Sequence, residues 1–258
     1  MVAAASFNRP WLPRHRHVSY PCIKPIDANN EMPDPESTLL QSWHHNARAW
    51  IEAIRSGTLA SRVQVTDQAM VLAVLGRQPE RVLDLGCGEG WLLRALTERG
   101  ITAVGVDGDA TLVEAARAAS ASPVYLASYA DLVEAKVDVG RDYDLICANF
   151  ALLHQDIIAL LAAMNALLAP GGALVIQTLH PWSVAAGDYQ DGWREETFAG
   201  FNGQWQPMPW YLRTLSSWFN ALDMAGFCLA ALQEPQHPQS PVPQSLLLVA
   251  EKRSDHNK

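Results

Sequence analysis

The sequence predicts an α/β fold with a mostly parallel, doubly wound sheet that helices cover on both faces. Short continuous apolar runs alternate along the chain with segments of helical periodicity, and strands buried on both faces have this appearance. A helix between consecutive strands makes those strands parallel. The last two runs are joined by a proline-rich turn without a helix, so we expect an antiparallel hairpin at the end of the sheet.

Seven apolar runs are predicted as strands. They lie at residues 81–85, 102–107, 123–127, 143–149, 172–179, 227–233 and 245–251. The predicted helices lie at residues 37–56, 66–75, 90–99, 109–120, 128–135, 156–168 and 214–225. The helix at 156–168 has the clearest signal, because Ile157, Leu160, Leu161 and Met164 share one face and Pro170 follows as a stop.

We expect one domain over residues 37–258, preceded by an irregular tail at residues 1–36. The prolines of the tail interrupt any amphipathic helix, which argues against a transit peptide, and Met32 is an alternative start. Residues 37–66 are expected to form a cap helix. Residues 180–210 are too long for an ordinary connection and carry four tryptophans, so we expect an aromatic lid or substrate insertion there.

Charge and cysteine content narrow the class of partner. The net charge is −8, and no dense stripe of Lys and Arg could follow a phosphate backbone, which argues against nucleic acid. The four cysteines lack metal-ligand spacing, so we expect no metal site and a reducing compartment. No apolar run is long enough to span a bilayer. We therefore expect a cytoplasmic protein with a small-molecule partner, and the oligomeric state is left open.

A glycine-rich turn follows the first predicted sheet strand, at residues 86–90. Such turns let a ligand approach the backbone closely, and a dinucleotide site is the first alternative. A dinucleotide loop needs a third glycine where this chain has Trp91, and the last glycine, Gly90, comes one place early. A helix N-terminus that binds a pyrophosphate is normally free of acids, whereas this turn carries Glu89 and follows Asp84.

These acids favour a cationic ligand. A sulfonium and an ammonium group suit both carboxylates, although Glu89 alone also fits a role against the helix dipole. Asp84 is harder to explain without a ligand, since an acid in a buried strand needs a partner. Asp107 ends the next strand, where a carboxylate can accept both ribose hydroxyls of an adenosine.

The order of these residues and elements resembles the class I S-adenosylmethionine-dependent methyltransferases, specifically small bacterial ones of the ubiquinone and menaquinone biosynthesis type. The resemblance extends over residues 66–252 and implies a Rossmann-like seven-stranded sheet with an antiparallel C-terminal strand. It implies S-adenosylmethionine as cofactor, with S-adenosylhomocysteine as product. The cofactor-binding residues that it implies are Asp84, Gly86, Cys87, Gly88, Asp107, Gly108, Ser128, Tyr129, Asn149 and Phe150.

Two features near this site depart from the resemblance or add to it. Many family members have an acid after the third strand to bind the adenine amino group, whereas this chain has Ser128, and Asp131 is expected one turn into the helix. Trp43, Trp50 and Arg62 are candidates to close the cofactor pocket from the N-terminal side.

The acceptor side has no obligatory signature, because methyl transfer from a sulfonium is an in-line displacement that needs a base only for protonated acceptors. His180 follows the fifth strand and is the candidate base, or else it only holds the loop. His154 is read as a helix cap or a surface residue. The candidate substrate residues are Trp182, Trp193, Tyr211 and Arg213, which either cover an apolar or planar acceptor or fill a satellite core.

The sequence thus predicts an enzyme that methylates an oxygen, nitrogen or carbon of a small molecule. Two alternatives remain open at this point. One is a binding module for S-adenosylmethionine without catalysis, and the other, disfavoured by Trp91 and the acids, is an NAD(P)-dependent oxidoreductase.

Overall fold

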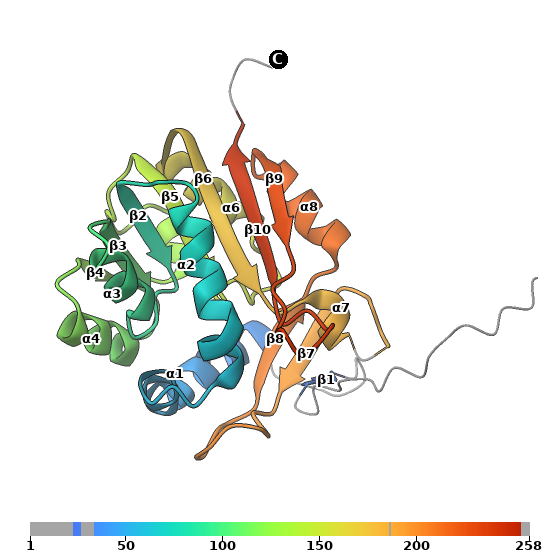
Figure 1. The fold of residues 1–258 in the computed structure, drawn as a ribbon. Helices are drawn as coiled ribbons and strands as arrows, with labels where there is room; N and C mark the ends of the chain where they lie inside the picture. The colour runs from blue at the N-terminus through green and yellow to red at the C-terminus, as the bar shows by residue number, and fades with distance from the viewer. Residues whose placement is uncertain (1–22, 27–33, 186, 254–258) are drawn as a thin grey trace, which may run out of the picture.

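The central sheet of the protein has the seven strands that the sequence predicts (Figure 1). The computed structural model describes residues 23–26, 34–185 and 187–253. In sheet order the strands are β4 (Val124–Leu126), β3 (Thr102–Asp107), β2 (Arg81–Leu85), β5 (Tyr143–Asn149), β6 (Leu168–Thr178), β10 (Leu246–Lys252) and β9 (Phe227–Gln233). Strand β10 is antiparallel to both of its neighbours, and the pairs from β4 to β6 are parallel. The predicted fold class is confirmed.

Helices pack on both faces of this sheet because successive strand residues point to opposite sides. Val82 of β2 lies in one core cluster with α2 (Asp67–Leu75), α3 (Trp91–Thr97) and α4 (Ala110–Ala119). The next residue, Leu83, lies in the other cluster with α5 (Tyr129–Val133), α6 (Ile158–Leu167) and α8 (Leu215–Met224). This double coverage explains why the strands read as continuous apolar runs.

A second, three-stranded sheet is the main departure from the predicted elements. Its order is β1 (Ile23–Pro25), β7 (Gly192–Glu196) and β8 (Met208–Leu212), and the helix α7 (Pro181–Val184) precedes β7. The predicted irregular tail therefore contains a strand, and the predicted aromatic loop contains two. Strand β1 has only three residues, and its hydrogen-bonding partner lies far along the chain, so local periodicity could not reveal it. Met32 lies outside the described residues.

The predicted cap helix is α1 (Pro35–Arg55), and a π-helical turn at Arg62–Thr66 leads from it into α2. Asp34 caps α1 by accepting from the backbone N–H groups of Glu36 and Ser37. Ser42 and Asn46 on α1 donate to the backbone oxygens of Pro207 and Gln206, just before β8. Helix α1 thereby links the second sheet to the carboxyl ends of the central strands, below which it lies in Figure 1.

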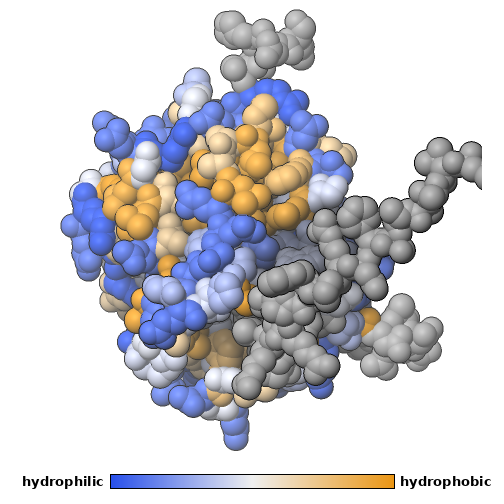
Figure 2. Space-filling model, turned by 45° about the vertical axis from the view of Figure 1, so that its right-hand side comes forward, coloured by the Kyte–Doolittle hydropathy of each residue, from blue (hydrophilic) through white to orange (hydrophobic). Residues whose placement is uncertain are grey.

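The surface near the β9 edge of the central sheet is partly apolar. Figure 2 brings that side of the molecule forward and shows an area of apolar side chains on it. Leu229 and Leu232 of β9 contribute exposed side chains, as does Leu72 of α2. Within the described ranges, every helix is too short or too polar to cross a membrane.

Candidate functional site

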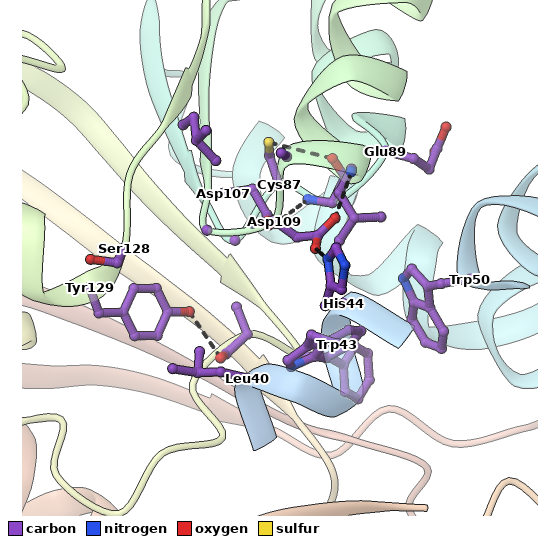
Figure 3. Close-up of a pocket in the computed structure, with 18 of the residues that line it drawn as sticks. Leu40, Trp43, His44, Trp50, Cys87, Glu89, Asp107, Asp109, Ser128 and Tyr129 are labelled. Carbon is purple, nitrogen blue, oxygen red and sulfur yellow. Dashed lines mark hydrogen bonds and ion pairs between the residues drawn. The ribbon is translucent and has the colours of Figure 1, made fainter. Parts of the chain in front are cut away.

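A cavity of about 680 Å³ opens at the carboxyl ends of β2, β3 and β5, the edge at which open α/β sheets bind ligands. Helix α1 covers it with the side chains of Leu40, Trp43, His44, Trp50 and Ile54 (Figure 3). The predicted cofactor residues that line the cavity are Arg62, Gly86, Cys87, Gly88, Asp107, Gly108, Ser128, Tyr129, Asn149 and Phe150. Asp84 lies just below this lining in β2, where it is buried.

The glycine turn has a backbone that only glycine adopts without strain. Gly86 has a φ of 69° and Gly88 a φ of 56°. A Cβ at Gly86 would lie 2.5 Å from the Cβ of Ala151, so the loop after β5 approaches the turn closely there. A Cβ at Gly88 would meet no atom within 4 Å, so that position faces open space in the cavity.

Asp107 shapes this turn. Its Oδ2 accepts a hydrogen bond from the backbone N–H of Gly88 at 2.9 Å, and its Oδ1 accepts one from Asp109 at 2.9 Å. Burial raises the pKa of the Asp107 carboxyl, while these hydrogen bonds oppose the rise. Each carboxylate oxygen still has a free lone pair, so Asp107 can hold the turn and accept ligand hydroxyls together.

Asp84 is an acid without a hydrogen-bond donor. Its residue surface is 2% exposed, and no donor among the described residues contacts its carboxylate. Burial, with the neighbouring Asp107 carboxylate, raises the pKa of Asp84 to about 7, while the charge of Arg62 opposes the rise. An unpaired buried carboxyl is costly, so this position calls for a cationic ligand.

Arg62 is the complementary group, a cation with an unused donor. Its Nε donates to Asp67 Oδ1 at 2.8 Å, and its guanidinium lies 4.8 Å from the ring centre of Trp91. Its Nη2 is buried and has no hydrogen-bond partner within the described part of the chain. The cavity wall therefore contains a cationic N–H donor without an acceptor, and the buried Asp84 carboxyl lies in the strand that leads into the glycine turn.

Glu89 does not add to the open negative charge, which corrects the sequence argument. Its carboxylate is buried between Arg55 Nε, at 2.9 Å, and Arg94 Nη2, at 2.6 Å. Helix α3 begins only at Trp91, so Glu89 stands before it and ties α1 to the glycine turn. The case for a cationic ligand rests on Asp84 and Asp107.

The turn between β4 and α5 lies on the side of the cavity where the resemblance implies an acid that binds the adenine amino group. Ser128 caps α5: its hydroxyl accepts from the backbone N–H of Asp131, and the Asp131 carboxylate accepts from the Ser128 hydroxyl at 2.6 Å. Asp131 lies in the first turn of α5 and lines the cavity. An acid is thus present at this wall, three residues later than the common pattern.

The tryptophans of α1 line the cavity but also belong to a satellite core. Trp50 packs edge-on against Trp43 at 5.6 Å and against Trp205 at 6.0 Å. Phe198 and Phe201 complete this aromatic cluster. Aromatic side chains from residues 180–210 therefore pack against α1.

The candidate base and the candidate substrate residues do not line the cavity. His180 is buried, and its Nε2 lies 2.8 Å from Glu234 Oε1, where it holds the segment after β6. Trp182 is 70% exposed and contacts Tyr189. The structure does not bring either residue to the cavity, because β7 and β8 fold away from it into the second sheet.

Three of the candidate substrate residues contact the loop at residues 151–155 and not the cavity itself: Trp193, Tyr211 and Arg213. Arg213 Nη2 donates to the backbone oxygens of His154 and Gln155, and the backbone N–H of Tyr211 donates to Leu153. Trp193 Nε1 donates to the Gln155 side chain at 3.1 Å. These residues support the back of a loop whose front, at Ala151 and His154, lines the cavity.

Nothing in the described part of the chain groups three or more His, Cys, Asp or Glu side chains in a way that could hold a metal ion. The polar groups that line the cavity include carboxylates, which accept hydrogen bonds, and the Arg62 guanidinium, which donates them. This set suits an organic ligand with both charges.

Sequence comparison with known proteins finds methyltransferases among the relatives of this chain. The ubiquinone biosynthesis O-methyltransferase of Brucella ovis is 31% identical over 102 residues, which are 39% of this chain and 41% of that protein. The enzyme of the same name from Chelativorans sp. is 33% identical over 120 residues, or 43% and 47% of the two chains. This chain thus matches less than half the length of these curated relatives.

Solved structures share the fold. The 1,6-didemethyltoxoflavin-N1-methyltransferase of Burkholderia thailandensis, solved with 1,6-didemethyltoxoflavin and S-adenosylhomocysteine, superposes with a TM-score of 0.60 at 22% identity over 90% of this chain and 95% of that one. An S-adenosylmethionine-dependent methyltransferase of Clostridium acetobutylicum gives a TM-score of 0.60 at 12% identity, over 81% and 99%. At these identities the likeness concerns the fold.

The family is decided by a match over most of the chain. The sequence profile of a methyltransferase domain matches residues 43–231, which include the glycine turn, Asp84, Asp107 and every strand from β2 to β8. The chain belongs to this methyltransferase domain family.

Proposed function

We propose that the protein transfers a methyl group from S-adenosylmethionine to an oxygen, nitrogen or carbon of a small molecule. The observation that carries the proposal is the pairing of unused charges beside the glycine turn: the Asp84 carboxylate without a donor and the buried Arg62 Nη2 without an acceptor. The methionine end of the cofactor has an ammonium, a carboxylate and a sulfonium. Both unpaired groups fit it.

Different residues would bind different parts of the cofactor. Asp84 would face the ammonium and Arg62 the carboxylate, and the Asp107 carboxylate would accept the ribose hydroxyls. Gly86 and Gly88 let the cofactor approach the backbone closely. Ser128 and Asp131 are the polar groups available to the adenine. When bound, the cofactor supplies an electrophilic methyl group, and the protein holds and aligns the reactants.

The acceptor would lie between α1 and the loops after β4 and β5. Trp43, Tyr129 and Phe150 give this part of the cavity aromatic walls, which supports an apolar or planar acceptor. Helix α1 covers the cavity and would exclude water from the reacting groups. The named relatives are O-methyltransferases of ubiquinone biosynthesis, as their names state, and an aromatic acceptor for this chain agrees with the lining of its cavity. The expected cytoplasmic location stays a prediction.

Titration calorimetry with S-adenosylhomocysteine, S-adenosylmethionine and NAD tests the cofactor. We expect micromolar dissociation constants for the first two and no measurable heat for NAD. Micromolar binding of NAD alone would overturn the proposal.

A second measurement separates an enzyme from a binding module. The purified protein is incubated with a bacterial metabolite extract and S-adenosylmethionine whose methyl group is deuterated. We expect a labelled small molecule in the mass spectrum. A protein that binds the cofactor but labels no compound would be assigned as the module.

A further inference from the structure

Two histidines line the cavity among the described residues, and one of them, His44 of α1, is paired with Asp109 at 3.1 Å. His154 lies in the loop after β5, lines the cavity from that side, and its side chain is 18% exposed. Its ring contacts the ring of Tyr129, with a centroid distance of 4.9 Å. Tyr129 in turn donates its hydroxyl to the Ala151 backbone at 3.0 Å, so it offers no proton to a ligand there.

The two ring nitrogens of His154 have different surroundings. Nδ1 is buried and has no hydrogen-bond partner in the part of the chain that the structure describes. Nε2 lies 3.8 Å from Glu36 Oε2, a buried oxygen that also lacks a hydrogen bond among the described residues. Since Nδ1 is sealed off, a hydrogen bond from the ring to a ligand has to come from the Nε2 edge.

These surroundings determine which ring nitrogen of His154 carries the proton. A proton on Nδ1 would leave a buried N–H without an acceptor, which is costly. A proton on Nε2 points to the side of the Glu36 carboxylate, which attracts it, yet 3.8 Å is too long for a hydrogen bond, so the donor stays available. The neutral ring should therefore carry its proton on Nε2.

The ring also stays neutral at physiological pH. The charged groups near it are Glu36 from the start of α1 and Arg213 after β8, with the Tyr129 hydroxyl from α5. Burial, together with the positive charge of Arg213, lowers the pKa of His154 to about 4. An imidazole in this state is a donor on one side and a poor base on the other.

We propose that His154 binds the methyl acceptor by donating a hydrogen bond from Nε2–H to an oxygen of a planar, phenolic acceptor, and that Glu36 and Arg213 are positioning residues that maintain this tautomer. The proposal rests on the proposed function, since it concerns the second substrate of the same cavity. It assigns a binding and specificity role to His154, and no proton transfer.

The chemistry follows from this assignment. A donor beside a phenolic oxygen favours its ionised form, and the hydroxyl proton leaves to solvent. The acceptor oxygen then forms a bond to the methyl carbon, the carbon–sulfur bond breaks, and sulfur keeps the electron pair as a neutral thioether. His154 carries the same proton before and after the step.

The tautomer can be measured without any ligand. In protein labelled with ¹⁵N-histidine, long-range ¹H–¹⁵N correlation spectra distinguish the Nε2–H, Nδ1–H and doubly protonated rings, and the spectrum of His154→Gln assigns the signal. We expect the Nε2–H form at pH 7, and a mixture of neutral tautomers in Glu36→Gln. A doubly protonated or an Nδ1–H ring in the wild type at pH 7 would overturn the proposal.

The binding role is tested with 4-nitrocatechol, a phenolic probe whose visible absorption reports ionisation, in the presence of saturating S-adenosylhomocysteine. His154→Gln keeps an N–H donor near the position of Nε2, whereas His154→Phe keeps only the ring contact with Tyr129. We expect the probe's dissociation constant to change by less than about threefold in His154→Gln and to rise by roughly tenfold or more in His154→Phe, as for a lost charge-assisted hydrogen bond. The bound probe should ionise at lower pH in wild type and His154→Gln than in His154→Phe.

The outcomes separate this inference from the proposed function. S-adenosylhomocysteine should bind all three proteins equally, and its failure to bind the wild type would reject the cofactor assignment instead. If it binds but 4-nitrocatechol does not bind the wild type, the phenolic class is wrong. Equal losses in both variants would show that the amide donor cannot replace the ring, which contradicts the donor role.

Discussion

Single residues around the glycine turn keep hydrogen-bonding groups that the described part of the protein does not use. Arg62 Nη2 has no acceptor there although Arg62 Nε is paired with Asp67, and no hydrogen bond offsets the burial of Asp84, while Glu89 is held by two arginines. The difference is one of partners, since the Glu89 side chain points away from the other labelled residues in Figure 3 and contacts Arg55 and Arg94, whereas Asp84 is buried in β2. We therefore propose that Asp84, Asp107 and Arg62 select the charge of the ligand.

Replacing Asp107 should weaken cofactor binding. In Asp107→Ala the ribose hydroxyls and the N–H groups of Gly88 and Asp109 lose their acceptor, so S-adenosylhomocysteine should bind about 1.5–3 kcal/mol less tightly. Calorimetry measures this change. Glu114→Ala, an exposed acid on α4, serves as the control and should bind normally. An unchanged dissociation constant in Asp107→Ala would refute the ribose role.

Cofactor affinity should depend on pH through Asp84. A ligand ammonium favours the ionised carboxylate, so affinity should rise as pH increases through about 7, and binding below that pH should release a proton. Calorimetry in buffers with different ionisation enthalpies counts that proton. Asp84→Asn should remove both the proton release and this pH dependence. If the variant still shows them, a group other than Asp84 causes them.

The same acid should affect stability in the opposite direction. The pKa of Asp84 is raised in the folded state from 3.8 to about 7, so between these values the native state binds more protons than the unfolded state. Without ligand, stability should therefore fall as pH rises from about 5 to 7, by an amount on the order of 1–3 kcal/mol. Urea denaturation of the wild type and of Asp84→Asn at pH 5 and pH 7 measures this change in unfolding free energy. The variant should not show it.

At the scale of elements, the site depends on turns and on the position of α1. The glycine turn adopts positive φ angles, and the loop after β5 is held from α5, β7, β8 and α1. Helix α1 is bound to the turn through Arg55 and Glu89. These contacts join segments that are distant in sequence into one rigid wall of the cavity.

Two glycine substitutions should separate folding from binding. Gly86→Ala introduces a Cβ 2.5 Å from that of Ala151 as well as backbone strain, so it should lower the melting temperature more than Gly88→Ala. Gly88→Ala carries backbone strain as well, because Gly88 also has a positive φ, but its methyl group meets open space. The protein should therefore fold, while the methyl group in the cavity should weaken S-adenosylhomocysteine binding. Thermal melts and calorimetry provide the two readouts. Equal melting temperatures would contradict the close approach at Gly86.

Removing the charge of Glu89 should loosen α1. In Glu89→Gln two partly exposed arginines lose the charge of their shared, buried partner, which should lower the free energy of unfolding by about 1.5–3 kcal/mol. Urea denaturation measures the loss. The control is Glu251→Gln, which breaks the exposed pair with Arg77 and should cost about 0–1 kcal/mol. Similar costs for the two variants would mean that Glu89 does not anchor the helix.

At the scale of the whole molecule, the second sheet and α1 pack together as a satellite core. Ile23 of β1 contributes to it with Leu39 of α1 and Trp210 of β8, and α1 also covers the cavity. The second sheet thus contributes to the site by supporting its cover. We therefore propose that residues 23–253 act as one domain, in place of a tail followed by a domain.

Ile23→Ala tests this proposal. The truncation leaves a cavity in the satellite core and should lower the free energy of unfolding by about 2–4 kcal/mol. The exposed Leu72→Ala, as control, should change it by less than about 0.5 kcal/mol. Circular dichroism and tryptophan fluorescence should report one transition in urea. Separate transitions would indicate that the second sheet unfolds on its own.

Much of the fold is predictable because its signals are local. The strand boundaries of β2, β3, β5 and β9 agree with the predicted ranges, since each is a short apolar run between turn residues or helices. The hairpin of β9 and β10 followed from a proline-rich turn. The glycine turn and Asp107 could be identified for the same reason, as both stand at fixed offsets from a strand end.

Which of the candidate acceptor-side residues line the cavity depends on long-range contacts, which local sequence patterns do not reveal. His180 and His154 both follow a strand at the same edge of the sheet, and nothing local distinguishes them. The packing of β8 and α1 brings His154 to the cavity, while Glu234 holds His180 elsewhere. The one available signal was that His154 follows β5, the strand beside β2, and β2 leads into the glycine turn.

By itself, the sequence determined the sheet, its order of helices, the glycine turn and the acid at the end of β3, because periodicity and turn chemistry are properties of contiguous residues. Only the tertiary structure decided that Glu89 is neutralised, that Asp84 has no hydrogen-bond donor and Arg62 Nη2 no acceptor among the described residues, that residues 192–212 contact the back of the loop after β5, and that His154 lines the cavity. The physical reason is that partners of a charge or a hydrogen-bond donor are set by the packing of distant segments, which no local pattern encodes.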